Sequence, residues 1–205
     1  MICRWDRGIG RQLVGAATAH FDASGARHAS LFTFPNSAKH VGLYQKFGYS
    51  ARFLTAIMSA PVQGGRARQP RWLRYSGLTG EQRTECLDAC RDLTGALHEG
   101  LEGFALCHYG PRSEAGEGTC FVKFGAVRPG PAAGERFDRL LDACAALAMA
   151  VGMAKLHAGV NMARQEAYGH MVGRGFRTEI QGVTMHRPNE PGYSRPGVYV
   201  MDDWR

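Results

Sequence analysis

The sequence has no long apolar run. A membrane-spanning helix needs roughly 20 consecutive apolar residues, and the nearest candidate, residues 143–154, is short and consists mostly of small side chains. The first ten residues carry charges and glycines where a secretory signal needs an apolar stretch. We therefore expect a cytoplasmic protein that does not bind a membrane. At 205 residues, 44% of them hydrophobic, the chain can form one or two domains with a packed core, which excludes a largely disordered protein.

Paired cysteine motifs are also missing. The six cysteines include no C-x-x-C pair, and a chain of this size needs no disulfide to fold. Cys86 and Cys90 lie on a predicted helix and could join His98 or His108 in a metal site. A zinc site, however, usually shows a second closely spaced pair of ligands. The sequence therefore predicts no metal, and small buried thiols are the simpler interpretation.

Acidic residues are scarce in the first part of the chain. Residues 1–76 contain 11 Lys and Arg against 2 Asp and Glu, whereas residues 77–205 contain 14 against 16. A basic segment favours an anionic partner, such as nucleotide phosphates, nucleic acid or a membrane surface. A solvated basic face gives the same composition, and charge alone does not decide between them.

Helical and extended patterns alternate along the sequence. Apolar periodicity predicts helices over 8–25, 37–47, 81–100, 135–152 and 163–175. Runs rich in β-branched and aromatic residues predict strands over 28–34, 49–61, 102–110, 119–127, 155–161, 176–187 and 198–204. This alternation predicts an α/β (mixed α+β) fold, with a mixed sheet flanked by helices.

Three details of these helices follow from single residues. The first helix carries an apolar stripe that includes Leu13 and Phe21. Asn36 or Ser37 can cap the second helix, and Thr79 can cap the third. Such residues bond the free amide groups of a first turn, so they indicate where a helix begins.

A basic segment divides the chain into two parts. Residues 62–77 contain four arginines, four glycines or prolines, and no acidic residue, which is typical of a linker. Trp72 and Tyr75 could instead stack on the bases of a nucleic acid, but the segment lacks a repeated basic pattern, and we do not expect nucleic acid as the partner. The predicted organisation is a first domain at 1–62, a linker at 63–77 and a second domain at 78–205.

The two parts contain an internal repeat. Residues 28–61 and 155–188 both run strand, Asn, helix bearing a Tyr, Gly, aromatic residue, strand and Pro. The landmark pairs are Asn36 and Asn161, Ala38 and Ala163, Tyr44 and Tyr168, and Pro61 and Pro188. A series of landmarks at a nearly constant separation indicates two related halves that arose by duplication.

The segment Arg7-Gly8-Ile9-Gly10 opens the first helix. Glycines let the backbone approach a ligand closely, and the free amide groups of a first helical turn bind anions. The spacing is not that of a dinucleotide-binding loop, because Leu13 stands where the third glycine is required. A Walker A loop is excluded, because no Gly-Lys-Ser/Thr follows. A plain helix start remains the alternative interpretation.

Together with the segments that follow it, this loop resembles the GNAT acetyltransferase family. The resemblance spans Arg7 to about Pro61 and includes a later segment with Asn36, Leu43, Tyr44, Gly48 and Tyr49. It implies that acetyl-CoA is the co-substrate and that the glycine loop holds its pyrophosphate. The implied cofactor-binding residues are Arg7, Gly8, Ile9, Gly10, Arg11 and Asn36.

Tyr44 matches the tyrosine that this family places near the thioester sulfur, and the resemblance implies that it is the catalytic general acid. Acetyl transfer to an amine requires that the departing sulfur be protonated. A tyrosine, with a pKa of about 10, is neutral at pH 7 and can donate that proton. The alternative is a buried aromatic residue whose hydroxyl bonds the backbone.

The second half resembles the same fold from Gly103 onward. Its corresponding loop, residues 128–136, contains two prolines, which lack amide donors, and Glu135, which would repel a phosphate. We therefore expect this half to be degenerate and Tyr168 to be structural. The first half has only six residues before its glycine loop, so the resemblance implies a tandem GNAT-like protein with a truncated first domain.

The sequence thus predicts an N-acetyltransferase that transfers an acetyl group from acetyl-CoA to an amine. The acceptor and the general base are not identified by any motif. A non-catalytic or truncated GNAT-like module that acts through ligand or protein binding is the alternative, and nucleic-acid binding through the basic half is a third. An incomplete sheet would leave an exposed edge that invites pairing with a partner, of which a homodimer is one form.

Overall fold

The structure, a computed structural model, describes residues 7–62, 73–93 and 101–202, with only the backbone described for 89–93. Trp72 and residues 94–100 of the predicted third helix therefore lie outside the described residues. Within them, no helix is both long enough and apolar enough to cross a membrane.

The part of the chain that contains the first repeat, residues 7–62, folds in the predicted order of helix, strand, helix and strand. Its elements are α1 (Ile9–Ala23), β1 (Ala29–Thr33), α2 (Ala38–Gln45) and β2 (Ser50–Pro61). Gly8 and Gly25 flank α1 with φ angles of 74° and 71°, a left-handed conformation that glycine adopts without strain. Ser37 stands at the predicted cap of α2, but its hydroxyl lies 2.7 Å from His40 Nδ1 and makes no capping hydrogen bond.

The rest of the chain also follows the predicted order. Its elements are η1 (Tyr75–Gly77), α3 (Gly80–Leu93), β3 (Gly103–Gly110), β4 (Gly116–Val127), α4 (Ala133–Ala150), β5 (Lys155–Asn161), α5 (Gln165–Gly173), β6 (Arg177–Arg187) and β7 (Val200–Asp202). At the start of α3, the Gln82 amide donates to Thr79 Oγ1 (3.3 Å) and the Thr79 amide donates to Gln82 Oε1 (3.0 Å). This reciprocal pair is a capping box, and it confirms the predicted cap.

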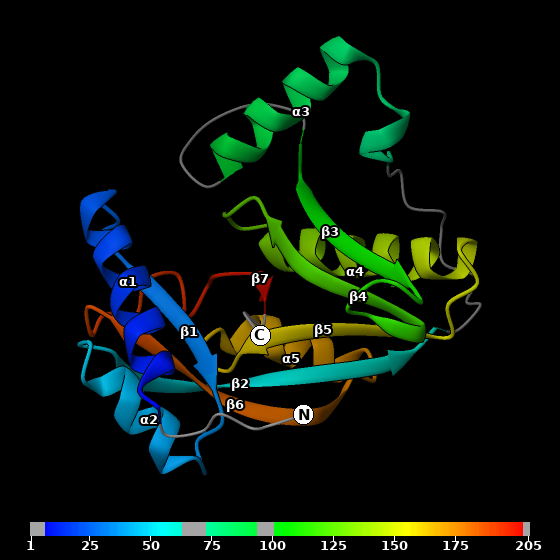
Figure 1. Cartoon of the computed structure of the whole chain (residues 1–205). Helices are drawn as coiled ribbons and strands as arrows, with labels where there is room; N and C mark the ends of the chain where they lie inside the picture. The colour runs from blue at the N-terminus through cyan, green and yellow to red at the C-terminus, as the bar shows by residue number, and fades with distance from the viewer. Residues whose placement is uncertain (1–6, 63–72, 94–100, 203–205) are drawn as a thin grey trace.

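Seven strands form a single mixed sheet. Their order is β1-β6-β2-β5-β4-β3, and β7 pairs with β4 (Figure 1). β4 and β5 pair in parallel, whereas the other pairs are antiparallel. The predicted mixed sheet flanked by helices is thereby confirmed.

The strands of the two repeats interleave. β1 of the first repeat pairs with β6 of the second, β5 of the second pairs with β2 of the first, and β6 and β2 pair at the centre. The last strand of each repeat therefore lies beside the first strand of the other. Both sides of the linker thus contribute to one sheet, and the division into domains at 62 and 78 stays a prediction.

The main hydrophobic core lies against the helices of the second repeat. α4 packs on β3 and β4 and on α5, and it buries Ala133, Phe137, Leu141, Cys144 and Ala148. A smaller core forms where α2 covers β6 and β1. It contains the buried residues Tyr49, Val183 and Met185. The two cores are unequal, because the second repeat has two more strands, β3 and β4, under its long helix.

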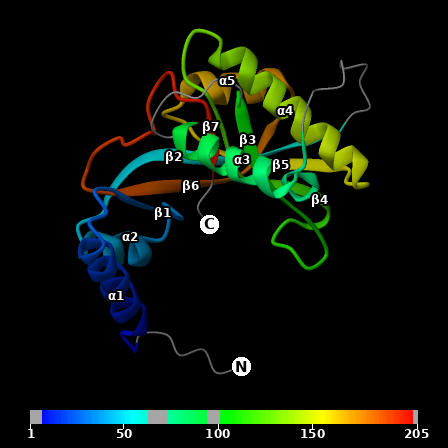
Figure 2. The ribbon, with the colours of Figure 1, turned by 90° about the horizontal axis from the view of Figure 1, so that it is seen from above.

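α1 is a helix with little beneath it. Thr18 is its one buried residue, and the predicted apolar stripe is exposed, with Leu13 66% and Phe21 37% accessible. The helix prediction is confirmed, and the apolar stripe lies largely at the surface among the described residues. α1 packs extensively on none of the described strands. Figure 2 shows α1 and α2 at the end of the molecule away from α4 and α5.

β4 and β5 separate beyond their parallel segment. They pair from Thr119 to Val122 on β4, and further along the same strand Phe124, Gly125 and Ala126 pair with β7 instead. β7 also contacts β5. The C-terminal strand therefore fills the space that opens between the two parallel strands.

Candidate functional site

The N-terminus of α1 is open to solvent. Gly8 is its N-cap and makes no side-chain capping bond, and the first helical hydrogen bond runs from the Gln12 amide to the Gly8 carbonyl (3.1 Å). The amides of residues 9–11 precede this bond, so they have no carbonyl partner within the helix. All residues from Arg7 to Gln12 are exposed. Three free N–H groups at an exposed glycine start form a site that can accept an anion.

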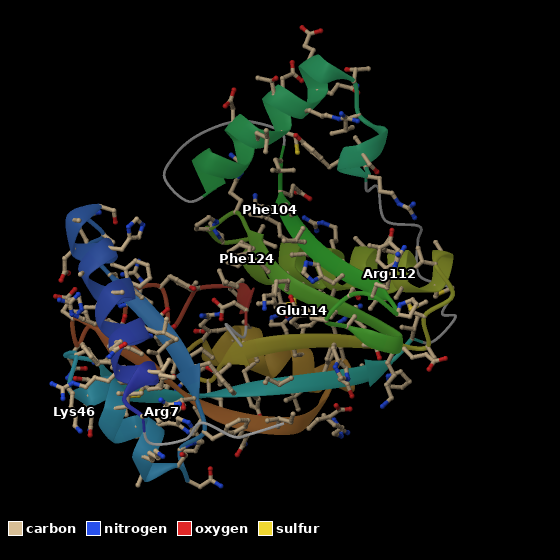
Figure 3. The ribbon with its side chains drawn as sticks, viewed as in Figure 1. Arg7, Lys46, Phe104, Arg112, Glu114 and Phe124 are labelled. Atoms are coloured by element: carbon tan, nitrogen blue, oxygen red, sulfur yellow. The ribbon has the colours of Figure 1, made fainter. Side chains whose placement is uncertain are left out.

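The electrostatics of this helix start favour an anion. The first turn of α1 contains no acidic residue, and Arg7 and Arg11 stand on either side of the glycines. The positive end of the helix dipole adds to their charge. Figure 3 shows Arg7, just before α1, and Lys46, just after α2, on the same side of the molecule.

Glycines allow α1 to lie against α2. A Cβ on Gly10 would stand 3.7 Å from Leu43 Cδ2, and a Cβ on Gly15 would stand 3.2 Å from Phe47 Cε1. A side chain at Gly15 would therefore require the Phe47 ring, just after α2, to shift. This contact brings the first turn of α1 beside Leu43, the neighbour of Tyr44 in the sequence.

Tyr44 lies on α2 and is half-buried. It packs against the smaller core, and its ring meets that of Tyr49 edge-on with centroids 6.4 Å apart. Asn36 is exposed in the turn before α2. The structure thus brings the glycine start of α1 next to the helix that carries Tyr44. Asn36 stands on the connection between β1 and α2, and its assignment to the cofactor stays a prediction.

The corresponding helix start in the second repeat is covered. Arg136 Nη1 donates to the carbonyls of Arg128 and Pro129 (both 3.4 Å), and so ties down the loop. A Cβ on Gly134 would stand 3.3 Å from the Tyr199 hydroxyl, so the C-terminal segment lies directly over the first turn of α4. The first turn also contains Glu135. Burial, and then the nearby carboxylates of Glu166 and Asp138, raise the pKa of Tyr199, so this phenol remains neutral.

A buried ion pair that the sequence analysis missed holds the C-terminal strand in place. Arg164, just before α5, donates from Nη2 to both oxygens of Asp202 on β7 (3.1 and 3.0 Å) and from Nη1 to the Val200 carbonyl (2.7 Å). The side chains of the pair are 2% and 3% exposed. Tyr193 donates its hydroxyl proton to Asp202 at 2.6 Å. A buried charge pair with every oxygen bonded fixes the position of β7.

A small cavity next to this ion pair contains two histidines. His28 from the first repeat and His186 from the second meet edge-on with ring centroids 4.7 Å apart. His186 Nδ1 lies 2.6 Å from the Glu190 carbonyl oxygen. Because a carbonyl oxygen only accepts, Nδ1 carries the hydrogen and donates this bond. Burial is the main cause that lowers the pKa of His186; the hydrogen bond to the Glu190 carbonyl opposes it, and the nearby guanidinium groups of Arg52 and Arg164 add to it.

Asn161 is buried, in contrast to its repeat partner Asn36. Its Nδ2 donates to the hydroxyls of Thr55 (3.2 Å) and Thr184 (3.1 Å), and its Oδ1 accepts from the Ala163 amide (3.0 Å). These bonds join three strands at the centre of the sheet. The repeat landmark is thus structural in the second copy.

The cysteines of the described core are free thiols. Cys120 and Cys144 are buried and Cys107 is half-buried, as the sequence predicts. Hydrogen bonding with Cys107, and then burial, raise the pKa of the Cys120 thiol. Within the described ranges, no three His, Cys, Asp or Glu side chains gather as a metal site. The Cys90 side chain and His98 lie outside the described residues.

The comparisons with known proteins support the fold. The sequence model of the Acetyltransferase (GNAT) family matches residues 4–49, which include the glycine start of α1 and Tyr44. A GCN5-related N-acetyltransferase from Sphaerobacter thermophilus has a TM-score of 0.50 at 14% identity, and the match covers 89% of this chain and 68% of that one. The fold is that of the GNAT acetyltransferases.

Two further solved structures share the GNAT fold. A putative acetyltransferase from Pyrococcus horikoshii has a TM-score of 0.54 at 14% identity, with 98% of this chain and 67% of that one covered. A GCN5-related glucosamine N-acetyltransferase region of a fungal multi-domain GH3 β-N-acetylglucosaminidase has a TM-score of 0.54 at 15% identity, with 89% of this chain and 28% of that one covered. No curated protein sequence matches the chain significantly.

Proposed function

We propose that this protein is an N-acetyltransferase that moves an acetyl group from acetyl-CoA to an amine, and that its coenzyme site lies in the first repeat. The observation that supports this site is the contrast between two related helix starts. The start of α1 has exposed amides, two arginines and no acid, whereas the start of α4 carries Glu135 and is covered by Tyr199. An anionic coenzyme is attracted to the first and repelled from the second.

In this proposal, the amides of Ile9, Gly10 and Arg11 hold the diphosphate of the coenzyme, and Arg7 adds positive charge. The amine attacks the thioester carbonyl carbon, a C–N bond forms, and the C–S bond breaks. Tyr44 gives its phenolic proton to the departing thiolate, and the amine loses a proton to a base. This proton transfer makes the thiol a better leaving group.

Binding is tested by titrating acetyl-CoA against the native chain and two matched variants. We expect the native chain to gain about 2.7 kcal/mol of stability when the ligand is at about 100 times its Kd. Gly8→Asp places a carboxylate at the helix start and should weaken binding about tenfold or more. Gly25→Asp makes the same charge change at the other left-handed end of α1 and should bind normally. No stabilisation of the native chain, or equal loss in both variants, would contradict the site.

Catalysis is tested with the two tyrosines that the repeat relates. Tyr44→Phe should lower kcat by about 10²- to 10⁴-fold, which is the usual contribution of a general acid, and should leave the affinity for acetyl-CoA unchanged. Tyr168→Phe removes the same hydroxyl from the second repeat and should keep full activity. Equal activity of the Tyr44→Phe and native proteins over a panel of amines would remove Tyr44 from the mechanism.

A binding module without catalysis is the second candidate function. The observation in its favour is that β7 occupies the space between β4 and β5, so that one repeat is closed by the chain itself. This candidate predicts that acetyl-CoA binds without any turnover across the amine panel. Acetylation of any amine that depends on Tyr44 would exclude it.

A further inference from the structure

The second helix of the first repeat carries a histidine next to Tyr44. His40 and Tyr44 lie four residues apart on α2, and both are half-buried. Residues at this spacing share one face of a helix, with their Cβ atoms about 6 Å apart. Helical side chains lean toward the N-terminus, so Tyr44 reaches back over the turn that carries His40. The imidazole and the phenol are therefore close enough to act on one substrate.

The same face of α2 meets α1. Gly10 lies against Leu43, and Gly15 lies against Phe47, so the two helices run in the same direction and their N-termini are at one end. Leu43 follows His40 by three residues and is its neighbour on this face. His40 thus stands on the side of Leu43 that is nearer the two helix starts, where the coenzyme diphosphate is proposed to bind.

A hydroxyl group holds the His40 ring. Ser37 is the N-cap residue of α2, a position where a serine hydroxyl usually bonds a backbone amide of the first turn. Here Ser37 makes no such bond, and its Oγ lies 2.7 Å from His40 Nδ1. When Nδ1 donates to this oxygen, the neutral ring carries its hydrogen there, and Nε2 keeps a lone pair that can accept a proton.

Few other groups before the linker can serve as a base. The described residues of this part contain one acidic residue and three histidines. The acidic residue, Asp22, makes a bidentate pair with Arg187, which holds the pKa of the carboxyl below its usual range. His28 lines the small cavity, and His20 lies in the last turn of α1, at the end away from the glycine start. Of these groups, His40 is the one beside Tyr44.

The second repeat lacks this pair of groups. Arg164 stands four residues before Tyr168, at the position that a histidine takes in the first repeat. Its guanidinium is bound to Asp202 and has no lone pair that accepts a proton. The acid–base spacing therefore belongs to the repeat with the open helix start and not to the one whose helix start is covered.

We propose that His40 is the general base of the acetyl transfer and that Ser37 is its positioning residue. This inference rests on the N-acetyltransferase activity proposed for the protein. His40 Nε2 accepts the proton that the amine nitrogen loses as the C–N bond forms, and Tyr44 gives its proton to sulfur as the C–S bond breaks. The proton on His40 then returns to the Tyr44 oxygen through solvent, which restores both side chains and leaves one amide and one thiol.

The base is tested by the release of coenzyme A thiol from acetyl-CoA, with spermidine, glucosamine and lysine methyl ester as saturating amines. His40→Gln should lower kcat by about 10²- to 10⁴-fold and leave the affinity for acetyl-CoA unchanged. The native kcat should fall as the pH drops, because a protonated imidazole accepts no proton, and this acid limb should be absent from His40→Gln. The matched control, His20→Gln, removes an exposed histidine from α1 and should keep both the rate and the acid limb.

The acid limb reports the imidazole. The ionisable groups around His40 are Tyr44 and Lys39 on α2, and Arg7 and Arg11 at the start of α1. Lysine and arginine side chains stay charged, and tyrosine stays neutral, on the acid side of neutral pH. A change in the limb between the native protein and His40→Gln therefore arises from the histidine.

The orientation of the ring is measured without turnover. Nitrogen-15 NMR of the free protein should place the hydrogen of the neutral His40 ring on Nδ1, and Ser37→Ala should remove this preference. Ser37→Ala should also lower kcat, by less than His40→Gln does, with the affinity for acetyl-CoA unchanged. Circular dichroism and thermal unfolding confirm that the variants fold.

Three results would overturn the base and leave the proposed activity standing. They are an acid limb that persists in His40→Gln, a loss of acetyl-CoA affinity in that variant without a loss of kcat, and a neutral native ring with its hydrogen on Nε2. The second result would assign His40 to phosphate binding. No turnover of any amine by the native chain would overturn the activity and the base together. Loss of kcat and of the acid limb in His40→Gln, but not in His20→Gln, supports the proposal.

Discussion

The two repeats share an order of elements but differ in what surrounds them. α1 and α4 both precede a strand, a short helix and a long strand, yet α4 buries five residues and α1 buries one. The difference lies in the strands beneath, because β3 and β4 support α4, whereas α1 has no equivalent among the described residues. An apolar stripe therefore indicates that a helix forms, but its burial depends on a partner elsewhere in the chain.

The starts of the two helices differ in the same sense, with that of α4 covered and that of α1 exposed. In the second repeat, the segment after β6 returns over α4 and ends as β7 between β4 and β5, where the Arg164–Asp202 pair holds it. In the first repeat, the glycine start of α1 stays accessible. The part of the chain after the linker thus contains the packed core, whereas the start of α1 in the part before it stays exposed.

The largest contrast should appear in the cores under the two helices. Phe137→Ala leaves a cavity beneath α4 and should lower the free energy of unfolding by roughly 4 kcal/mol. Leu13→Ala removes a mostly exposed side chain and should change it by less than about 0.5 kcal/mol. Urea titration measures both. A large loss in Leu13→Ala would show that α1 packs more closely than its 66% exposure indicates.

The next contrast concerns the ion pairs of the two repeats. Asp202→Ala leaves Arg164 buried without its carboxylate, and should cost about 3 kcal/mol of unfolding free energy. Asp22 makes a bidentate pair with Arg187 (2.7 and 3.0 Å) at the surface, where water screens the charges. Asp22→Ala should therefore leave the denaturation midpoint nearly unchanged. If both variants lost a similar free energy of unfolding, burial would not determine how much the Arg164–Asp202 pair stabilises the protein.

The repeat asparagines should show a smaller difference. Asn161→Ala removes three hydrogen bonds from the buried centre of the sheet and should cost about 2 kcal/mol, because Thr55 and Thr184 lose a donor there. Asn36→Ala at the exposed turn should change stability by less than about 0.5 kcal/mol. Thermal unfolding of the two variants compares them. Equal shifts would indicate that Asn36 is structural as well.

The smallest effect should come from pH. The pKa of His186 is lowered in the folded protein, so on acidification the unfolded chain takes up a proton near its ordinary pKa of about 6.5 while the folded chain does not. The free energy of unfolding is therefore at its full value above that pH and decreases as the pH drops through it. His186→Gln should reduce this loss between about pH 7.5 and 5.5. An unchanged pH profile in the variant would show that His186 does not contribute to it.

Much of this fold could be predicted from local sequence. Apolar periodicity located α1, α2, α4 and α5, glycines marked where helices end, and Thr79 indicated the start of α3. The repeat was inferred from landmarks that keep a nearly constant spacing, and it stays a prediction. Each of these features depends on residues that are close together in the chain or repeated in order.

What could not be predicted depends on contacts between distant segments. The exchange of β2 and β6 between the repeats follows from pairing across more than a hundred residues, for example Thr55 with Gly182. Arg164 and Asp202 are 38 residues apart, and neither belongs to a motif. In the candidate site, the glycine start of α1 could be recognised in the sequence. The covering of the start of α4 by Tyr199 and β7 could not, because the sequence of a strand does not show which strand it will pair with.

The interleaved sheet has a consequence for synthesis on the ribosome. Both neighbours of β2 in the sheet, β5 and β6, are translated well after it. The centre of the sheet can thus close only after both of them have emerged, and non-local pairing of this kind is slow. Until then β2 stays exposed, so the nascent chain should depend on chaperones. Low growth temperatures should therefore raise the yield of folded protein.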